Sequence, residues 1–196
     1  MHEFNWIGLI VFSTVLLGTP GPAVISLFYS GINYGLKNSL PYFFGVLVGF
    51  MFNLVICAFG VGVILEFETV YSALKIAMLG YICCFAYRIA TSAPLDAVGE
   101  TKPLHFMQGI LLNLLNPKAY VAAMSAISQF SLASNYIQSA FLVVVVNSIL
   151  AFVFHGLWCF SGQYVRRLFA HPKWYRTINV LLAVLLVLSV TIVYLV

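Results

Sequence analysis

The sequence predicts an all-α, polytopic membrane protein with six transmembrane helices in two inverted three-helix repeats, the first and fourth helices being broken. Its composition, its apolar runs and a pair of matching motifs predict this fold. Of the 196 residues, 63% are hydrophobic and only 7% are charged, whereas soluble domains average about 45–50% apolar and about 25% charged residues. Lipid can surround so much apolar surface if each spanning segment satisfies its own backbone hydrogen bonds, which favours helices.

Six segments are apolar and long enough to cross the membrane, which takes about 20 residues for about 30 Å of hydrocarbon. They are residues 4–29, 40–65, 70–90, 105–127, 136–160 and 174–196. The second, fifth and sixth segments have no charge or proline in their interiors, so we expect continuous helices there. A single membrane domain follows, with a first repeat at 1–90, a cytoplasmic linker at 91–104 and a second repeat at 105–196.

Lysine and arginine set the expected orientation, because cytoplasmic loops of membrane proteins are enriched in them. The loops 30–39, 91–104 and 161–173 hold most of these residues, so we expect these loops in the cytoplasm and both termini outside. The basic cluster at 164–176 lies between two apolar runs, which indicates a loop that faces anionic lipid headgroups. We therefore expect no nucleic-acid partner.

The first and fourth segments are interrupted at nearly the same place. The first contains LLGTPGPAVISLF at Leu16–Phe28, and the fourth contains LLNLLNPKAYVAAM at Leu111–Met124. Proline lacks a backbone N–H and clashes with the preceding helical turn, so the helix opens. A three-helix unit reverses the chain direction, so two copies are inverted, as in many transporters. The alternative is that these prolines only kink their helices.

The interruptions supply a candidate binding site for a zwitterion. A half-helix start offers N–H groups to a carboxylate, and opened carbonyl groups can accept from an ammonium group. The candidate substrate-binding residues are Thr19, Pro20, Gly21, Pro22, Asn53, Asn113, Asn116, Pro117 and Lys118. Lys118 would assist with the carboxylate, or alternatively reach a lipid headgroup.

At these residues the chain resembles the LysE/RhtB family of bacterial amino-acid exporters, over essentially its whole length. The resemblance is carried by TPGP at 19–22, SGINYGLKNSLPYFFGVLVG at 30–49 and GILLNLLNPKAYVAAMSAISQF at 109–130. Within the family, YICCFAYRIATS at 81–92 and WCFSGQYVRRLF at 158–169 are similar to the cysteine/O-acetylserine exporter branch. The resemblance implies an inner-membrane antiporter that exports small amino acids or their derivatives, driven by protons. Its partners would be substrate, protons and lipid, and a homodimer is possible.

The positions of the acidic residues favour a neutral substrate. The acidic residues are Glu3, Glu66, Glu68, Asp96 and Glu100, all near helix ends or in loops. A cationic side chain would find no interior counter-charge, and burying it unpaired is costly. We therefore expect a small neutral substrate such as cysteine, O-acetylserine, threonine or homoserine, carried by alternating access.

Other polar and small residues have less specific roles. His155 and Lys118 are the candidates for proton coupling. Histidine titrates near physiological pH, although a hydrogen-bonded packing histidine is the alternative for His155. The glycines expected to allow close helix packing are Gly31, Gly35, Gly45 and Gly49, which form two GxxxG steps.

The remaining function classes are less well supported by the sequence. The four cysteines, Cys57, Cys83, Cys84 and Cys159, lie in apolar runs without a metal-binding spacing, so we expect no metal and no cofactor. An enzyme is not expected, because there is no GxSxG motif and no acid to orient the histidine. A transmembrane thiol–disulfide electron carrier and a non-transporting membrane subunit remain as alternatives.

Overall fold

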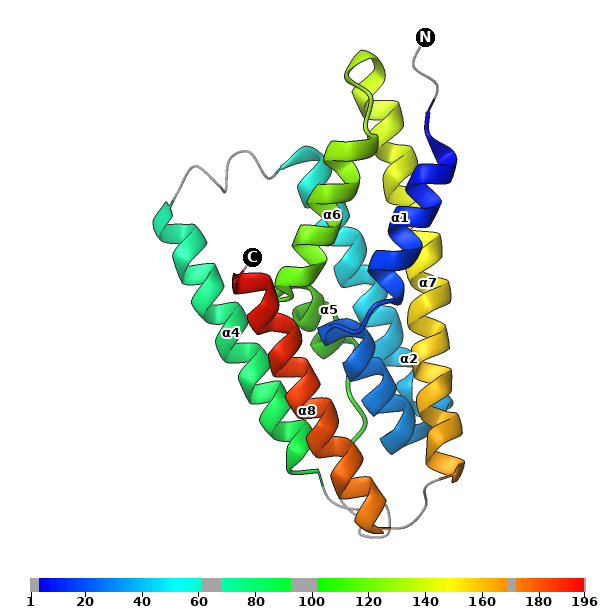
Figure 1. Ribbon diagram of the computed structural model, residues 1–196, viewed down its shortest axis with the longest axis vertical. Helices are drawn as coiled ribbons and strands as arrows, with labels where there is room; N and C mark the ends of the chain where they lie inside the picture. Colours follow the sequence, from blue (N-terminus) through cyan, green and yellow to red (C-terminus); the bar gives the residue numbers. More distant parts are fainter. Residues whose placement is uncertain (1–3, 61–67, 93–101, 169–171, 196) are drawn as a thin grey trace.

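The computed structural model describes residues 4–60, 68–92, 102–168 and 172–195, and these ranges contain helices and no strands (Figure 1). The helices are α1 (Trp6–Gly18), α2 (Pro22–Phe59), α4 (Glu68–Ala90), α5 (Phe106–Leu114), α6 (Pro117–Phe130), the 3-10 helix η2 (Ala133–Asn135), α7 (Tyr136–Leu168) and α8 (Pro172–Leu195). The prediction of an all-helical protein is confirmed for the described ranges.

The lengths of these helices confirm the membrane class. By length and composition, Pro22–Phe59 and Ala133–Arg166 each contain an apolar stretch that can cross a membrane, and α5 with α6 makes a third span if this bent pair is counted as one. The other apolar helices of the described ranges are shorter, at Trp6–Gly18, Ile76–Ala90 and Arg176–Thr191. Six complete spans therefore stay a prediction.

The predicted loop at 30–39 is wrong, because α2 is helical on both sides of a single residue, Gly35. Gly35 has φ 73° and ψ 169°, a left-handed conformation that glycine adopts at little cost. The chain reverses there, so that a first arm (22–34) and a second arm (36–59) form a hairpin (Figure 1). Ser39 Oγ donates to the carbonyl oxygen of Gly35 at 2.8 Å, and Ser30 Oγ donates to Ser39 Oγ at 2.7 Å.

The predicted loop at 161–173 is also largely wrong, because α7 continues to Leu168 and α8 begins at Pro172. Gly162 does not stop α7, since it packs so tightly on the carbonyl group of Phe28 that a Cβ atom would collide with it. Pro172 suits the first position of a helix, where its missing N–H has no helical partner. Most of the predicted linker at 91–104 lies outside the described residues.

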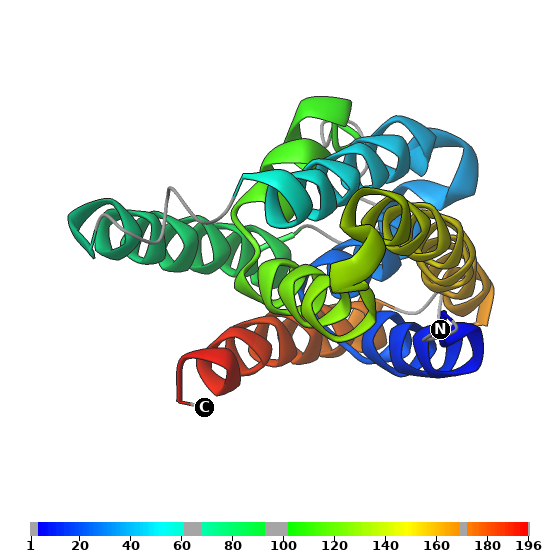
Figure 2. The ribbon, with the colours of Figure 1, turned by 90° about the horizontal axis from the view of Figure 1, so that it is seen from above.

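The helices run back and forth along the long axis of the molecule (Figure 1). In this view α1 and the first arm of α2 descend, the second arm ascends, α4 descends, α5 and α6 ascend, α7 descends and α8 ascends. α2 is central and packs against α7, α5 and α6. α4 packs on α8 and projects to one side, as the view from above also shows (Figure 2).

Two buried apolar clusters hold the helices together. One joins α2, α4 and α8 and includes Tyr42 and Leu186, and the other joins α1, α6, α7 and the end of α2 and includes Leu9 and Val143. Many large apolar side chains also point outward, such as Ile7, which is 79% exposed. An apolar exterior of this kind suits lipid, which cannot hydrogen-bond with the protein surface.

Glycines allow α2 to approach α5 at backbone distance. A Cβ atom on Gly45 would collide with the carbonyl oxygen of Phe106, and one on Gly49 would lie 2.8 Å from the carbonyl oxygen of Ile110. These contacts join the first half of the sequence to the second half.

We expect Gly45→Ala to lower the free energy of unfolding by about 1–3 kcal/mol, the usual cost of overpacking. The Phe106 carbonyl is part of the backbone and cannot rotate away from the new methyl group. Gly80→Ala is the matched control, because no heavy atom lies within 4 Å of a Cβ atom there. Denaturant unfolding of both variants in detergent micelles measures the difference, and equal stabilities would contradict the close packing of α2 on α5.

Candidate functional site

The two predicted interruptions are breaks between separate helices. α1 ends at Gly18 and α2 begins at Pro22 after the extended residue Gly21. α5 ends at Leu114 and α6 begins at Pro117, and the two helices are bent by 64°. Proline is well tolerated at the first position of a helix. Each of these prolines therefore starts a new half-helix.

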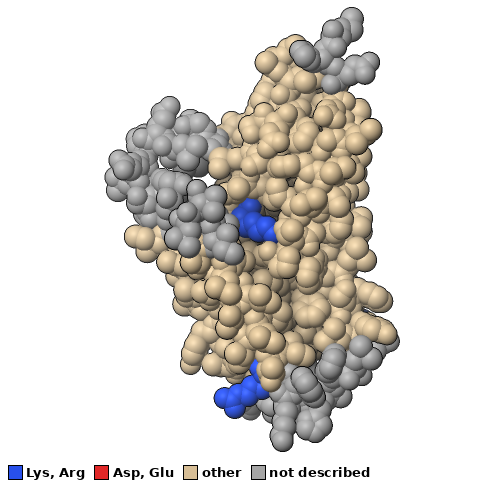
Figure 3. Space-filling view, viewed as in Figure 1, with Lys and Arg blue, Asp and Glu red and all other residues tan. Residues whose placement is uncertain are grey.

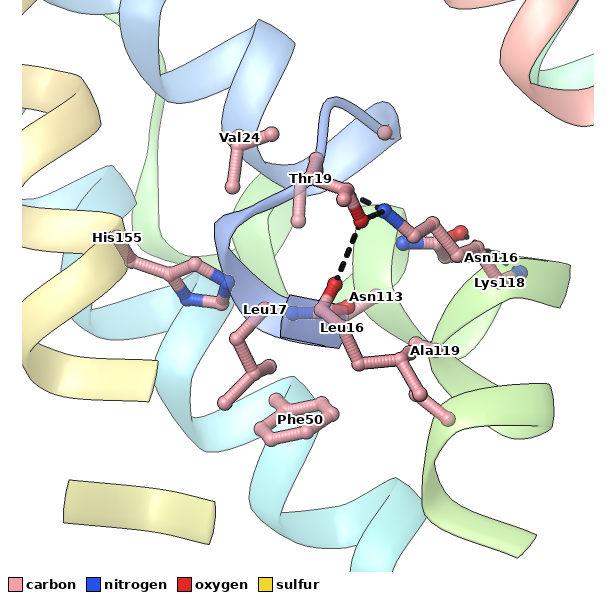
Figure 4. A pocket seen from close by; sticks show the side chains of 13 residues that line it. Leu16, Leu17, Thr19, Val24, Phe50, Asn113, Asn116, Lys118, Ala119 and His155 are labelled. Carbon is pink, nitrogen blue, oxygen red and sulfur yellow. Dashed lines mark hydrogen bonds between the residues drawn. The ribbon is translucent and has the colours of Figure 1, made fainter. Parts of the chain in front are cut away.

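Lys118, the second residue of α6, connects the two breaks (Figure 4). Its Nζ donates to the carbonyl oxygen of Thr19 at 2.8 Å, to Thr19 Oγ1 at 2.8 Å and to the carbonyl oxygen of Pro20 at 3.1 Å. The carbonyl end of a helix carries a partial negative charge, which attracts a cation. In Figure 3 a basic side chain lies in a hollow at mid-height, the level at which α6 begins.

The two half-helix starts at these breaks differ in their caps. At α6, Asn116 Oδ1 accepts a hydrogen bond from the backbone N–H of Lys118 at 3.1 Å. At α2, the cap residue Gly21 provides no side-chain hydrogen bond. Gly21 also leaves room for Lys118, since a Cβ atom there would lie 2.6 Å from Lys118 Cδ. The start of α2 therefore combines uncapped N–H groups with a nearby ammonium group, as an anion site requires.

A small cavity lies between the two breaks, walled by α1, α2, α5, α6 and α7. Its polar lining residues are Thr19, Asn113, Asn116, Lys118 and His155. The cavity has a volume of about 30 Å³, which is room for one or two water molecules. It is too small for an amino acid.

Asn113 and Asn53 are held by hydrogen bonds to the backbone. Asn113 Nδ2 donates to the carbonyl oxygen of Val46 at 2.5 Å, and Asn53 Nδ2 donates to the carbonyl oxygen of Asn113 at 2.8 Å. Both side-chain oxygens are buried without a hydrogen-bond partner among the described residues. Asn113 lines the cavity, whereas Asn53 does not line the cavity but bonds to the backbone of Asn113.

His155 reaches the same cavity from α7, and its imidazole points toward the first break (Figure 4). The side chain is only 3% exposed, and its ring centroid lies 6.2 Å from that of Phe50. Its Nδ1 is buried without a partner in the described part of the chain. The sequence singled out this histidine, but nothing in the sequence indicated that it lies beside the TPGP motif.

The other predicted site residues surround the cavity at different distances. Thr19 and Gly21 line it, whereas Pro20, Pro22 and Pro117 shape the breaks without lining it. The apolar residues that sequence analysis missed are Leu17, Val24, Phe50, Ala119 and Ala122, together with Leu16 and Ala23. An apolar residue of a membrane helix carries no sequence signal that separates a cavity wall from ordinary packing.

The four glycines predicted to allow close packing do not line this cavity. Gly31 packs on α7, where a Cβ atom would collide with the carbonyl oxygen of Cys159, and Gly45 and Gly49 pack on α5. Gly35 instead makes the turn of the hairpin. None of the four cysteines lines the cavity, and all four are free thiols.

We expect Asn116→Ala to lower the free energy of unfolding by about 1 kcal/mol, the usual cost of losing an N-cap. The side chain of Asn116 caps the start of α6. Asn38→Ala is the control, since Asn38 is exposed and donates only to the carbonyl oxygen of Tyr34 at 3.2 Å. The midpoints of thermal unfolding in detergent compare the two variants, and a loss as large for the control would refute the capping role.

Comparison with known proteins places the chain in a family. The family model described as LysE type translocator matches residues 14–194. A cysteine/O-acetylserine efflux protein of Escherichia coli O1:K1 is 31% identical over 176 residues, which cover 86% of this chain and 87% of the relative. Proteins of the same name from Escherichia coli strain K12 and Shigella flexneri serotype 5b are 30% identical with the same coverage. No solved structure matches the chain significantly.

The family match agrees with the helices described above. The apolar helices and the bacterial efflux relatives together indicate a multi-pass protein of the bacterial inner membrane. Translocators move solutes and do not transform them, so the chain is not an enzyme. The chain belongs to the LysE family of translocators.

Proposed function

We propose that this protein exports small neutral amino acids or their derivatives by proton-coupled alternating access. The observation that carries the proposal is the position of the Lys118 ammonium group, between the carbonyl groups of the first break and the uncapped start of α2. The cysteine/O-acetylserine efflux activity named for the relatives supports this substrate class.

The substrate carboxylate would bind at the start of α2. The backbone N–H groups of Ala23 and Val24 belong to the first turn there, and both residues line the cavity. Helix starts bind anions through such N–H groups, and a nearby ammonium group strengthens the attraction. Lys118 is the ammonium group in reach, because its side chain packs against Gly21.

The substrate ammonium group would take the acceptors that Lys118 now occupies. In this structure, the carbonyl oxygens of Thr19 and Pro20 accept hydrogen bonds from the Lys118 ammonium group. A carboxylate at the start of α2 attracts Lys118 toward itself and releases these carbonyl oxygens. They can then accept hydrogen bonds from the substrate, so that a zwitterion satisfies both ends of the site.

Alternating access requires two units that can move relative to each other around this site. We assign these units to the two inverted three-helix repeats, 1–90 and 105–196, which meet at the breaks. The back-and-forth course of the helices and the glycine contacts between α2 and α5 support this six-span layout. Because the cavity holds only one or two water molecules, the repeats must separate before a substrate enters.

We infer the orientation of the protein in the membrane from the basic residue at one end of the molecule. The turn at Gly35, the end of α4 and the end of α7 lie at the same end (Figure 1). A Cβ atom on Gly35 would lie 3.5 Å from Arg166 Nη1, which brings a basic residue of α7 to the hairpin turn. We assign this end to the cytoplasm because basic residues favour that side, with both termini outside.

Two titratable groups in the cavity are candidates for proton coupling, His155 and Lys118. Among the residues that the structure describes, no acidic side chain lines the cavity. The described lining therefore has cationic and neutral groups only, which disfavours a substrate with a cationic side chain.

The test is uptake into inside-out membrane vesicles, where export appears as accumulation. Under an imposed proton gradient we expect labelled cysteine, O-acetylserine, threonine or homoserine to accumulate, and lysine not to accumulate. Lys118→Met should raise KM about 10-fold or more, because a hydrogen bond to a charged group contributes about 1.5–3 kcal/mol. The matched control is Lys102→Met, since Lys102 is exposed and does not line the cavity.

Two results would overturn this proposal. If no neutral amino acid accumulated, the protein would fit the non-transporting subunit instead. If Lys118→Met and Lys102→Met had equal KM values, the carboxylate site would be misplaced.

We expect export to survive replacement of all four cysteines by alanine, because none of them lines the cavity. Cys83 and Cys84 are exposed on α4, and Cys159 is buried on α7. The cysteine-free protein is compared with the wild type in the same vesicles at matched expression. Loss of transport in a folded cysteine-free protein would revive the thiol–disulfide carrier.

A further inference from the structure

We propose that His155 recognises the side chain of the substrate, by a hydrogen bond to a thiol, hydroxyl or ester group. The preferred substrate class is then an amino acid with a short, uncharged side chain that carries one hydrogen-bonding group. This inference rests on the proposed function and specifies its substrate.

The cavity has polar side chains on two opposite sides. Lys118 and Asn116 approach it from α6, whereas His155 approaches from α7 on the opposite side (Figure 4). An amino acid that binds its carboxylate near Lys118 therefore directs its side chain toward α7. The apolar residues Val24 and Phe50 lie on this side with His155 (Figure 4).

His155 has unused hydrogen-bonding capacity in this position. The side chain is only 3% exposed, and its Nδ1 is buried without a hydrogen-bond partner among the described residues. Buried polar atoms in native proteins almost always have a partner, and the exceptions call for an explanation. The ring packs against Phe50, so the imidazole is held in place while this nitrogen remains unpaired. A ligand in the cavity can supply the missing partner.

The chemistry of imidazole explains how one histidine binds thiol, hydroxyl and ester groups. A neutral imidazole has one N–H donor and one acceptor nitrogen, and the two can exchange roles between tautomers. The same nitrogen can therefore accept from a thiol or hydroxyl group and donate to the carbonyl oxygen of an ester. One residue thus serves both a thiol and an acetyl ester, the two kinds of side chain named in the relatives' substrates. A cationic side chain would meet Lys118 in the same cavity.

The test compares cysteine with 2-aminobutyrate, whose ethyl side chain is similar in size but forms no hydrogen bond. In vesicles under reducing conditions, we expect the wild type to prefer cysteine by about 2- to 12-fold in kcat/KM, the equivalent of one net hydrogen bond. His155→Leu should abolish this preference, so that the kcat/KM values of the two compounds become equal whatever the overall export rate. His155→Asn should restore part of the preference, because its amide replaces the polar atom at the Nδ1 position.

Asn147→Leu is the matched control on the same helix. Asn147 is buried and donates to the carbonyl oxygen of Val143 at 2.9 Å, but it does not line the cavity. This variant should affect both substrates equally.

The wild-type comparison decides the proposal even if His155→Leu fails to fold. Equal export of cysteine and 2-aminobutyrate by the wild type, or an unchanged preference in His155→Leu, would overturn the role of His155 and leave the proposed function intact. If neither compound is exported, the proposed function fails as well.

Discussion

The contact between the Lys118 ammonium group and the carbonyl oxygens of Thr19 and Pro20 is the interaction on which the centre of the structure depends. A broken helix exposes carbonyl groups, and an apolar surrounding offers no partner for them or for a lysine charge. Where the two breaks meet, the exposed carbonyl groups accept hydrogen bonds from the lysine, so both groups have a partner. The contact joins residues 99 positions apart, and the cavity lies where the four helix ends come together.

The sequence predicted the breaks well because proline acts locally: it removes an N–H group and blocks the preceding turn wherever the chain later folds. The loops were predicted poorly. Gly35 reverses the chain within one residue, and α7 continues past Phe160 to Leu168 because Gly162 packs closely on α2. Such details depend on which helices become neighbours. The presence of His155 in the cavity depends on the same information, which a single sequence does not contain.

The proposed site would divide recognition between the main chain and the side chains. Helix ends and Lys118 would bind the carboxylate and ammonium groups, which all amino acids share, whereas the α7 side of the cavity would face the part that varies. The supporting residues are bound to backbone atoms, as Asn113 is to Val46 and Asn116 to Lys118. Their positions are therefore fixed by the same helices that form the cavity, and a relative movement of these helices alters all of these contacts together.

The one-residue turn at Gly35 has a mechanical consequence. A longer loop would let its two flanking helices shift independently. Here the hydrogen bond from Ser30 to Ser39 joins the two arms, and the one from Ser39 to Gly35 holds the turn. The first arm begins at the site with Val24, and the second arm carries Phe50 and the surface that touches α5. We therefore expect a displacement of one arm to move the part of the cavity lining that the other arm carries.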